Sequence, residues 1–226
     1  MFTGSSRLGS ALTGVLAIAI GGVLVSTVSI AQNTPIEIDT SAMQPGGEPE
    51  DFTFGRTGQG EGGKWTVVAD PTAAKGRAIA QISKDRTDYR FPLAVYKPYS
   101  GKDLEISVRF KPVAGTVDQA GGIAVRLATP GDYYVVRANA LEDNVRFYRV
   151  VKGKREQLAS ANAKVAANQW HTLALKAEGD RFTMSFDGKT LLSAQDRTFA
   201  DAGKVALWTK ADSVTYFDTI SITPLD

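Results

Sequence analysis

The stretch GDYYVVRANALEDNVRFYRV, Gly131 to Val150, predicts two antiparallel β-strands joined by a turn. Polar and apolar side chains alternate in both halves, and a strand places successive side chains on opposite faces of its sheet. One face is apolar and suits a core, whereas the other carries arginine, asparagine and tyrosine. This stretch therefore predicts the fold class, and its polar face raises the question of function.

Similar short segments recur from Phe52 onward, at a spacing of about ten residues, as in β-sandwiches. They are rich in β-branched and aromatic residues, and clusters of Gly, Asp, Asn and Pro separate them. The predicted strands are 64–70, 77–83, 104–113, 121–128, 132–140, 144–151, 170–178, 181–188, 190–194, 203–209 and 214–223. The pattern predicts an all-β fold, a two-sheet antiparallel sandwich without a helix of useful length.

Two short turns indicate how the segments pair. Asp187-Gly188 predicts a type I′ hairpin, because both central residues of that turn need a positive φ. Pro130-Gly131 supplies the proline and glycine of a type II turn. Each turn is expected to join two neighbouring antiparallel strands.

A second reversal, about Glu142-Asp143, brings three strands side by side and places Asn139 opposite Arg146. Alternation then assigns every side chain to a face. The expected polar face consists of Arg126, Tyr133, Arg137, Asn139, Arg146 and Tyr148. The expected core face consists of Ile123, Val125, Leu127, Tyr134, Val136, Val145 and Phe147.

The polar face has two interpretations. Antiparallel sheets often expose one face to water, so it can be an ordinary solvated surface. Alternatively it binds a carbohydrate, since rings stack on sugars while Arg and Asn donate hydrogen bonds to hydroxyls and carboxylates. The excess of arginine suits an oxidised or acidic sugar.

The chain is predicted to divide into a signal peptide (1–31), a flexible N-terminal arm (32–51) and the β-sandwich domain (52–226). Arg7 precedes an uncharged apolar run, and the small residues Ser29 and Ala31 precede the expected cleavage site. A retained membrane anchor is the alternative, because residues 8–31 carry no charge and could span a bilayer. Cleavage predicts a periplasmic or extracellular protein without membrane contact.

Composition excludes several kinds of chemistry. The chain has no cysteine and one histidine, which removes disulfides, thiolate nucleophiles and Cys- or His-rich zinc sites. Its formal net charge of +2 lacks the strong basic excess of nucleic-acid-binding proteins. The single histidine, His171, has no nucleophile near it in sequence and is predicted to be structural.

Two segments, Gly131–Val151 and Gly203–Ile222 with its GKVALWTKADS start and YFDTISI end, carry a family resemblance. Over Phe52–Pro224 the chain resembles the concanavalin A-like jelly-roll superfamily, which includes the laminin-G-like lectins. It is most similar there to the bacterial 3-keto-disaccharide hydrolase domains. The resemblance implies a jelly-roll sandwich that engages carbohydrate on a concave sheet, in a periplasmic or secreted setting.

The sequence departs from the hydrolytic members of that family. TVDQAGGIAVRL, Thr116–Leu127, stands where those members usually carry a GNSGI motif. The E-x-D-x-x-E motif of family-sixteen glycoside hydrolases, which supplies two catalytic carboxylates, is approached only by EIDTSA, Glu37–Ala42. That segment lacks the last glutamate, so the sequence favours binding over catalysis.

Asp218 is the candidate metal ligand. Alternation in VTYFDTISI places it among inward-facing residues, where a carboxylate must be hydrogen-bonded or ligated. The two alternatives are hydrogen bonds to backbone amides or an arginine, and a structural calcium ion bound through oxygen. The resemblance implies calcium, because the superfamily often holds this ion through an aspartate on its last strand. Trp208 is predicted to be a core residue.

Three functions follow from these observations. The first is an exported lectin-like domain that binds a glycan on the concave sheet. The second is a hydrolase or lyase acting on 3-keto-glycosides, which the resemblance implies. The third is a non-catalytic protein-interaction module, which would expose an apolar patch.

Overall fold

The structure is a computed structural model that describes residues 1–4 and 34–225. These residues contain fifteen β-strands and no helix. The predicted all-β antiparallel sandwich is confirmed. The predicted signal peptide falls, apart from its first four residues, outside the described ranges. Within those ranges no helix is long and apolar enough to cross a membrane.

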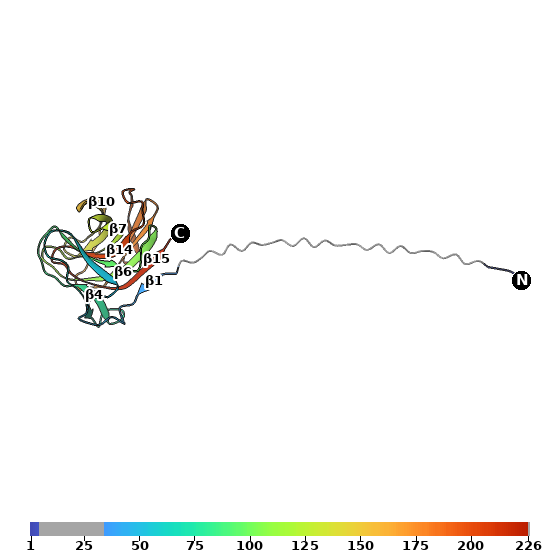
Figure 1. Ribbon diagram of the computed structural model, residues 1–226, viewed down its shortest axis with the longest axis horizontal. Helices are drawn as coiled ribbons and strands as arrows, with labels where there is room; N and C mark the ends of the chain where they lie inside the picture. The colour runs from blue at the N-terminus through green and yellow to red at the C-terminus, as the bar shows by residue number, and fades with distance from the viewer. Residues whose placement is uncertain (5–33, 226) are drawn as a thin grey trace. The chain divides into compact units, whose positions relative to one another are not determined.

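The strands form two antiparallel sheets (Figure 1). The eight-stranded sheet runs in the order β13 (Lys189–Gln195), β12 (Arg181–Phe186), β11 (His171–Glu178), β6 (Leu104–Ala114), β15 (Val214–Pro224), β4 (Arg77–Gln81) and β3 (Trp65–Ala69), and β1 (Ile36–Ile38) pairs with β15. The seven-stranded sheet runs in the order β10 (Lys154–Asn162), β9 (Asn144–Val151), β8 (Asp132–Asn139), β7 (Ala120–Thr129), β14 (Lys204–Thr209), β5 (Arg90–Tyr96) and β2 (Phe52–Gly58). Strands distant in sequence, such as β6 and β15, are neighbours in each sheet.

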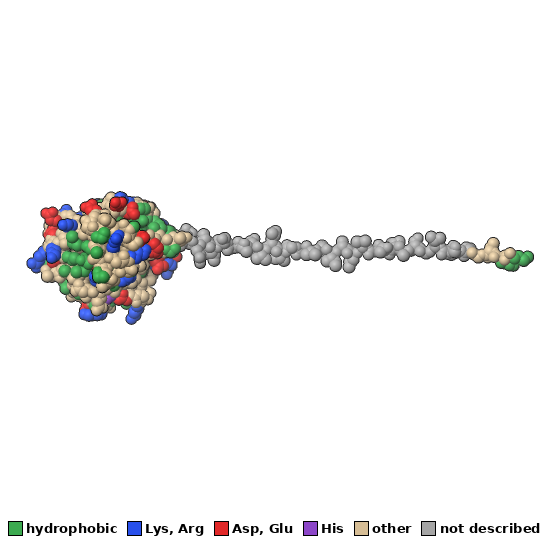
Figure 2. All heavy atoms as spheres, turned by 90° about the horizontal axis from the view of Figure 1, so that it is seen from below, with side chains coloured by type: hydrophobic (Ala, Val, Ile, Leu, Met, Phe, Trp, Pro, Cys, Tyr) green, Lys and Arg blue, Asp and Glu red, His purple; other side chains and the backbone are tan. Residues whose placement is uncertain are grey.

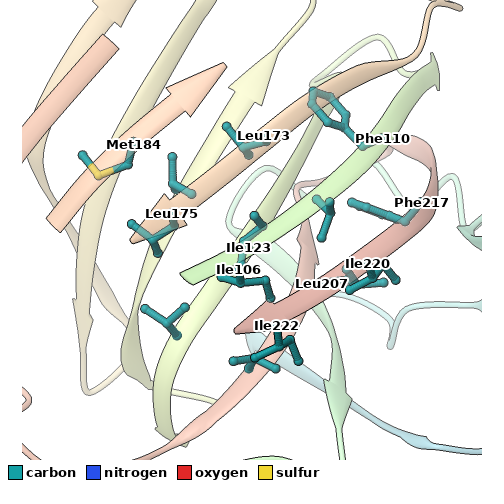
Figure 3. Packing of buried hydrophobic residues seen from close by; sticks show 14 of the residues in the cluster. Ile106, Phe110, Ile123, Leu173, Leu175, Met184, Leu207, Phe217, Ile220 and Ile222 are labelled. Carbon is teal, nitrogen blue, oxygen red and sulfur yellow. The ribbon is translucent and has the colours of Figure 1, made fainter. Parts of the chain in front are cut away.

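The core lies between the inner faces of the two sheets (Figure 3). Side chains of β6, β11, β12 and β15 meet side chains of β7 and β14 from the opposite sheet. The labelled residues in Figure 3 are Ile106, Phe110, Ile123, Leu173, Leu175, Met184, Leu207, Phe217, Ile220 and Ile222. Burial of apolar surface stabilises by about 25 cal/mol per Å². A core of this extent supports a fold that has no disulfide.

Residues 34–51, predicted to be a flexible arm, pack on the sandwich instead. β1 pairs with β15 in antiparallel register, and Ile38 is buried in the core. Backbone hydrogen bonds also join Gly46 and Gly47 to Val67 on β3. The three-residue sequence IEI is too short to show strand alternation clearly, and its neighbours are polar. The sequence pattern therefore did not predict β1.

The two predicted turns occur, with one difference. Asp187 and Gly188 both have positive φ, as a type I′ hairpin requires. Pro130 and Gly131 form the two-residue connection between β7 and β8. Gly131 does not have the positive φ of a type II turn, so the predicted turn type is wrong although the reversal is confirmed.

The register of the central hairpin differs from the prediction by two residues. Arg137 pairs with Arg146, and Asn139 pairs with Asn144. A shift of two residues leaves each side chain on its predicted face, whereas a shift of one would reverse the faces. The predicted face assignment for β8 and β9 therefore holds.

Candidate functional site

The outer face of the seven-stranded sheet carries a second apolar cluster, separate from the core. Trp208 stacks on Phe91 with ring centroids 5.3 Å apart, and its Nε1 lies 3.4 Å from the Tyr133 hydroxyl. Trp208 is fully buried, as predicted, but in this outer cluster and not between the sheets. The buried members are Phe91, Leu93, Ala120, Ala124, Leu127, Tyr133, Val135, Tyr148, Val150, Ala206 and Trp208.

A polar cluster continues this face, with Arg137 at its centre. Arg137 donates to the Asn144 side-chain and backbone oxygens, to Glu142 Oε2 at 2.8 Å and to the Tyr148 hydroxyl at 3.5 Å. Arg146 lies 3.3 Å from the same Glu142 oxygen. One carboxylate therefore pairs with two guanidinium groups.

Tyr148 is the common neighbour of three arginines. The Arg155 guanidinium lies over its ring at 4.3 Å, and Arg137 donates to its hydroxyl. Interaction with the same hydroxyl raises the pKa of Arg146. Arg155 also lies over Phe91 at 4.8 Å, so it joins the polar cluster to the aromatic one.

Two of these arginines keep hydrogen-bond donors that the protein does not use. Arg146 Nε and Arg155 Nη1 are covered by protein atoms and have no acceptor. Arg155 forms no ion pair with any described carboxylate. Buried donors without an acceptor are rare in native proteins and cost about 1–3 kcal/mol each. This cluster is therefore a candidate for ligand binding.

A second branch of the polar face centres on Asp118. Its two oxygens accept from Asn139 Nδ2 at 2.8 Å and pair with Lys210 Nζ at 2.9 Å. Burial raises the pKa of Asp118, and Lys210 and Arg137 oppose this only in part. Burial would also raise the pKa of Glu142, but Arg137, Asn144 and Arg146 outweigh it, and that pKa is lowered.

The structure brings five of the six predicted residues to this face: Tyr133, Arg137, Asn139, Arg146 and Tyr148. They are less solvated than a wet sheet face would be. Arg137 is 3% exposed and Asn139 is 1% exposed. Tyr133 is fully buried, and burial raises its pKa to about 12 while its hydroxyl meets Thr57 at 2.7 Å. Only Arg146, whose side chain is 34% exposed, offers substantial surface.

The sixth residue, Arg126, was placed on the wrong face. The β7 register shifts between Val125 and Thr129, and Arg126 has a φ of 49°, which turns its side chain to the other side of the sheet. There its guanidinium lies over Phe182 and donates to the carbonyl oxygens of Lys102, Phe199 and Gly179 and to the Asp103 carboxylate. Arg126 is therefore a structural residue at the edge of the hydrophobic core, where it joins several loops.

Asp218 also lies on a different face from the one predicted. A register shift in β15 after Asp218, with Thr219 at a φ of 46°, leaves Asp218 opposite Arg109 on the outer side of the eight-stranded sheet. Asp218 is 1% exposed, because the loop that contains Ala74 covers it and donates an N–H to its Oδ2 at 2.7 Å. Phe217 points into the core instead.

The environment of Asp218 is compatible with a calcium ligand. Its Oδ1 is buried and has no hydrogen-bond partner, and burial raises its pKa. Arg109 lies 3.6 Å away from Oδ2 and balances part of the charge. Residues 34–225 contain no group of three or more His, Asp or Glu side chains placed to hold a metal, so other ligands would be backbone carbonyls and water.

The single histidine of the chain, His171, is structural, as the sequence predicts. His171 is buried between Phe110 and Phe186, and its ring nitrogens lie 2.8 Å from Asp187 Oδ2 and 3.1 Å from the Ala166 carbonyl. Both nitrogens are engaged by the protein itself. His171 is therefore not free to act on a substrate.

Sequence reasoning missed Arg155 and Tyr89. Arg155 belongs to β10, a strand that the pattern did not reveal, although Lys152-Gly153 marks the turn before it with two positive φ values. Tyr89 is 42% exposed, stacks edge-on against Phe91, and accepts at its hydroxyl from the Arg155 N–H at 2.9 Å. Extending the strand meander by one hairpin would have placed Arg155 on the outer face.

Comparison with known families matches residues 105–225 to the family described as the galactocerebrosidase C-terminal lectin domain. The match covers more than half of the chain. The chain belongs to this lectin-domain family. The matched region includes β6 to β10 and β14, and with them every arginine around Tyr148.

Solved structures similar to this lectin domain share its fold. Carbohydrate-binding module CBM66 from Bacillus subtilis is 21% identical, with a TM-score of 0.58 over 75% of this chain and 94% of the other. Lectin II from Ulex europaeus is 9% identical, with a TM-score of 0.57 over 86% and 100%. The Bacillus licheniformis β-glucanase is 14% identical, with a TM-score of 0.52 over 81% and 97%. No curated protein sequence matches. These likenesses show that the lectin domain has a jelly-roll β-sandwich fold.

Proposed function

We propose that this domain binds a glycan on the outer face of its seven-stranded sheet, around Tyr148. The observation that carries the proposal is a cluster of three guanidinium groups, Arg137 and Arg155 at Tyr148 and Arg146 at Glu142, two of them with buried donors that no protein atom accepts. Membership of a lectin-domain family supports it. Five of the six residues predicted for the site lie on this face.

The chemistry of the face suits a saccharide. Sugar rings present C–H faces that pack on aromatic rings, and hydroxyls that accept hydrogen bonds from planar donors. Tyr89, which is 42% exposed, supplies a ring, and the partly exposed Arg146 and Arg155 supply guanidinium groups on the same face. The aromatic cluster beneath is fully buried, so it holds these groups in place before a ligand arrives.

The proposal is tested with a glycan array and one pair of variants. Arg155→Ala is expected to weaken binding about tenfold or more, because hydrogen bonds to charged groups contribute about 1.5–3 kcal/mol. Arg181→Ala is the matched control, since Arg181 is exposed on β12 of the other sheet. An array without any bound glycan, or equal affinities of the two variants, would reject the proposal.

One observation favours glycoside hydrolysis as a second candidate. Asp118 and Glu142 both face Arg137, and their pKa values are shifted in opposite directions, which is how glycosidases prepare an acid and a base. However, both oxygens of Asp118 are already engaged by Asn139 and Lys210. Incubation with a 3-keto-glucoside tests it. Catalysis predicts product release that Asp118→Asn reduces at least about a hundredfold.

We also propose that the protein is exported. Cleavage after Ala31 would leave the described domain whole, because its first strand, β1, begins at Ile36. Sequencing of the mature protein should find Gln32 at or near its N-terminus. An intact Met1 on membrane-bound protein would favour the anchor instead.

The third function, a protein-interaction module, has less support. The large hydrophobic side chains exposed in residues 34–225 are Phe54 in β2, Tyr89 in the loop before β5, and Leu141 in the turn between β8 and β9. A docking surface would need a contiguous apolar patch of several hundred Å².

A further inference from the structure

We propose that the Tyr148 site selects glycans carrying an anionic group, a carboxylate or a sulfate, and that Arg155 is the residue that recognises it. The inference rests on the proposed function and specifies its ligand class. It comes from the balance of charges around Tyr148 and from the donors that remain unpaired there.

The site has more cations than the protein neutralises. Glu142 is the partner of both Arg137, at 2.8 Å, and Arg146, at 3.3 Å. Arg155 has no carboxylate partner among residues 34–225. An anion would supply the missing partner.

The neighbouring lysine branch does not remove this surplus. Lys210 pairs with both Asp88, at 2.7 Å, and Asp118, at 2.9 Å. The carboxylates of that branch therefore already have a cation of their own. Together the two branches hold four cations and three carboxylates, which leaves one positive charge. Arg155 is the cation without a partner, so the surplus lies over the Tyr148 ring.

The orientation of Arg155 favours an anion bound at its edge. Its guanidinium lies over the rings of Tyr148, Phe91 and Trp208, at 4.3, 4.8 and 6.0 Å. A guanidinium stacked on rings points its N–H groups sideways, where a carboxylate or sulfate can accept two of them. Arg155 Nη1 is covered by protein atoms and has no acceptor among them, whereas the side chain as a whole is only partly buried, so an anion would contact its accessible part.

Other buried arginines show that this arrangement is unusual in the chain. Arg90 is fully buried and donates to the carbonyl oxygens of Glu61 and Gly62 and to the Ser83 hydroxyl. In the described part of the chain, buried arginine nitrogens without an acceptor occur at Arg56, Arg146 and Arg155, and two of these three adjoin Tyr148.

The attraction for an anion would be local. The formal net charge of the chain is only +2, and the face seen in Figure 2 intersperses basic and acidic side chains. Long-range attraction is therefore weak, and exposed charges are screened beyond about 8 Å at physiological salt. Selectivity would come from direct contact with Arg155.

Calorimetric titration of the full domain tests the proposal with matched ligands. Trigalacturonic acid and its methyl ester have the same sugar rings and differ in charge, and a sulfated galactan oligosaccharide is the second anionic probe. We expect at least one anionic probe to bind about tenfold tighter than the methyl ester. Preference for the uronate or for the sulfate identifies which anion the site accepts.

Variants separate charge recognition from general sugar binding. Arg155→Gln keeps side-chain N–H donors and removes the charge, so it should lower anionic affinity about tenfold and change methyl-ester affinity less than about twofold. Arg181→Gln, on the other sheet, should change neither. Thermal melting of each variant verifies that it is folded.

Two outcomes overturn the inference. If the methyl ester binds as tightly as the anionic probes, the site is a neutral-sugar site, and the proposed glycan function survives without this specificity. If Arg155→Gln lowers both affinities equally, Arg155 does not read charge. Absence of binding by every probe and by the glycan array would reject the glycan function itself.

Discussion

Two arginines on the seven-stranded sheet, Arg126 and Arg155, occupy contrasting environments. Arg126 is 2% exposed and donates to four acceptors at the margin of the core. Arg155 lies on the outer face over aromatic rings and keeps a buried N–H without an acceptor. The protein uses the donors of the first guanidinium, whereas it gives the second no carboxylate partner and leaves its Nη1 without an acceptor. The first is therefore part of the fold, and the second is suited to a ligand.

The largest effect that tests this contrast is expected from Arg126→Ala. The substitution removes the Arg126 donors from three carbonyl oxygens and leaves the Asp103 carboxylate with only the Gly179 N–H. Removing one partner of a buried ion pair costs about 3–5 kcal/mol, and the lower end is expected because the Asp103 side chain is 25% exposed. Urea denaturation should show this loss. Arg155→Ala, at a partly exposed site, should change the unfolding free energy by less than about 1 kcal/mol. Equal losses in the two variants would erase the distinction between them.

The same contrast explains which parts of the structure the sequence could predict. Alternation assigned Arg137, Asn139, Arg146 and Tyr148 correctly, because β8 and β9 pair without a bulge. It failed at Arg126 and Asp218, where β7 and β15 shift register. Each bulge contains a non-glycine residue with positive φ, Arg126 itself and Thr219, and such residues carry no recognisable sequence signal.

Strand β10 was missed for a different reason. β10 is an edge strand with the sequence KREQLASAN, and none of its residues is fully buried. Its hydrophobic alternation is correspondingly weak, so Arg155 was missed. Arg155 lies near Tyr148 because β10 pairs with β9. This pairing depends on tertiary structure and cannot be predicted from the sequence of β10 alone.

The second prediction concerns Asp218 on the other sheet, where an acceptor and not a donor is unpaired. If calcium binds there, it adds about 2.7 kcal/mol of stability at a free concentration one hundred times its Kd. Thermal melting with and without a chelator measures this. Asp218→Asn should melt at the same temperature under both conditions. A wild-type melting temperature that ignores both chelator and added calcium would reject the ion.

Without calcium, the pH dependence of Asp218 should have a defined sign. Burial raises its pKa in the folded state, so the folded protein holds the proton more tightly than the unfolded chain. This contribution is present below the unfolded carboxyl pKa and is lost as pH rises through the raised folded value. In chelator, the stability difference between wild type and Asp218→Asn should therefore change across that window.

Arg137→Ala is expected to have a smaller effect on stability. Arg137 is 3% exposed and holds Asn144 and Glu142, so it is a scaffold residue of the site and not the solvated donor that the sequence suggests. Its loss should cost about 2 kcal/mol, as for a buried acceptor left unpaired. Denaturation measures this loss, and glycan affinity should fall as well. Loss of affinity with unchanged stability would instead place Arg137 in direct contact with the ligand.

Glu142→Gln gives the smallest expected effect on stability and sharpens the comparison most. The Glu142 side chain is 38% exposed, so its pairing with Arg137 and Arg146 contributes less than about 1 kcal/mol. Its pKa is lowered because the two arginines and Asn144 outweigh burial, so its contribution is present above the unfolded pKa and fades as pH falls through the folded value. The melting difference between wild type and Glu142→Gln should shrink accordingly on acidification. At neutral pH the variant removes the carboxylate that pairs with Arg137 and Arg146, so affinity for an anionic glycan should rise while affinity for its methyl ester stays constant. Titration of both ligands measures this, and a fall in anionic affinity would mean that Glu142 orients these arginines for the ligand instead of competing with it.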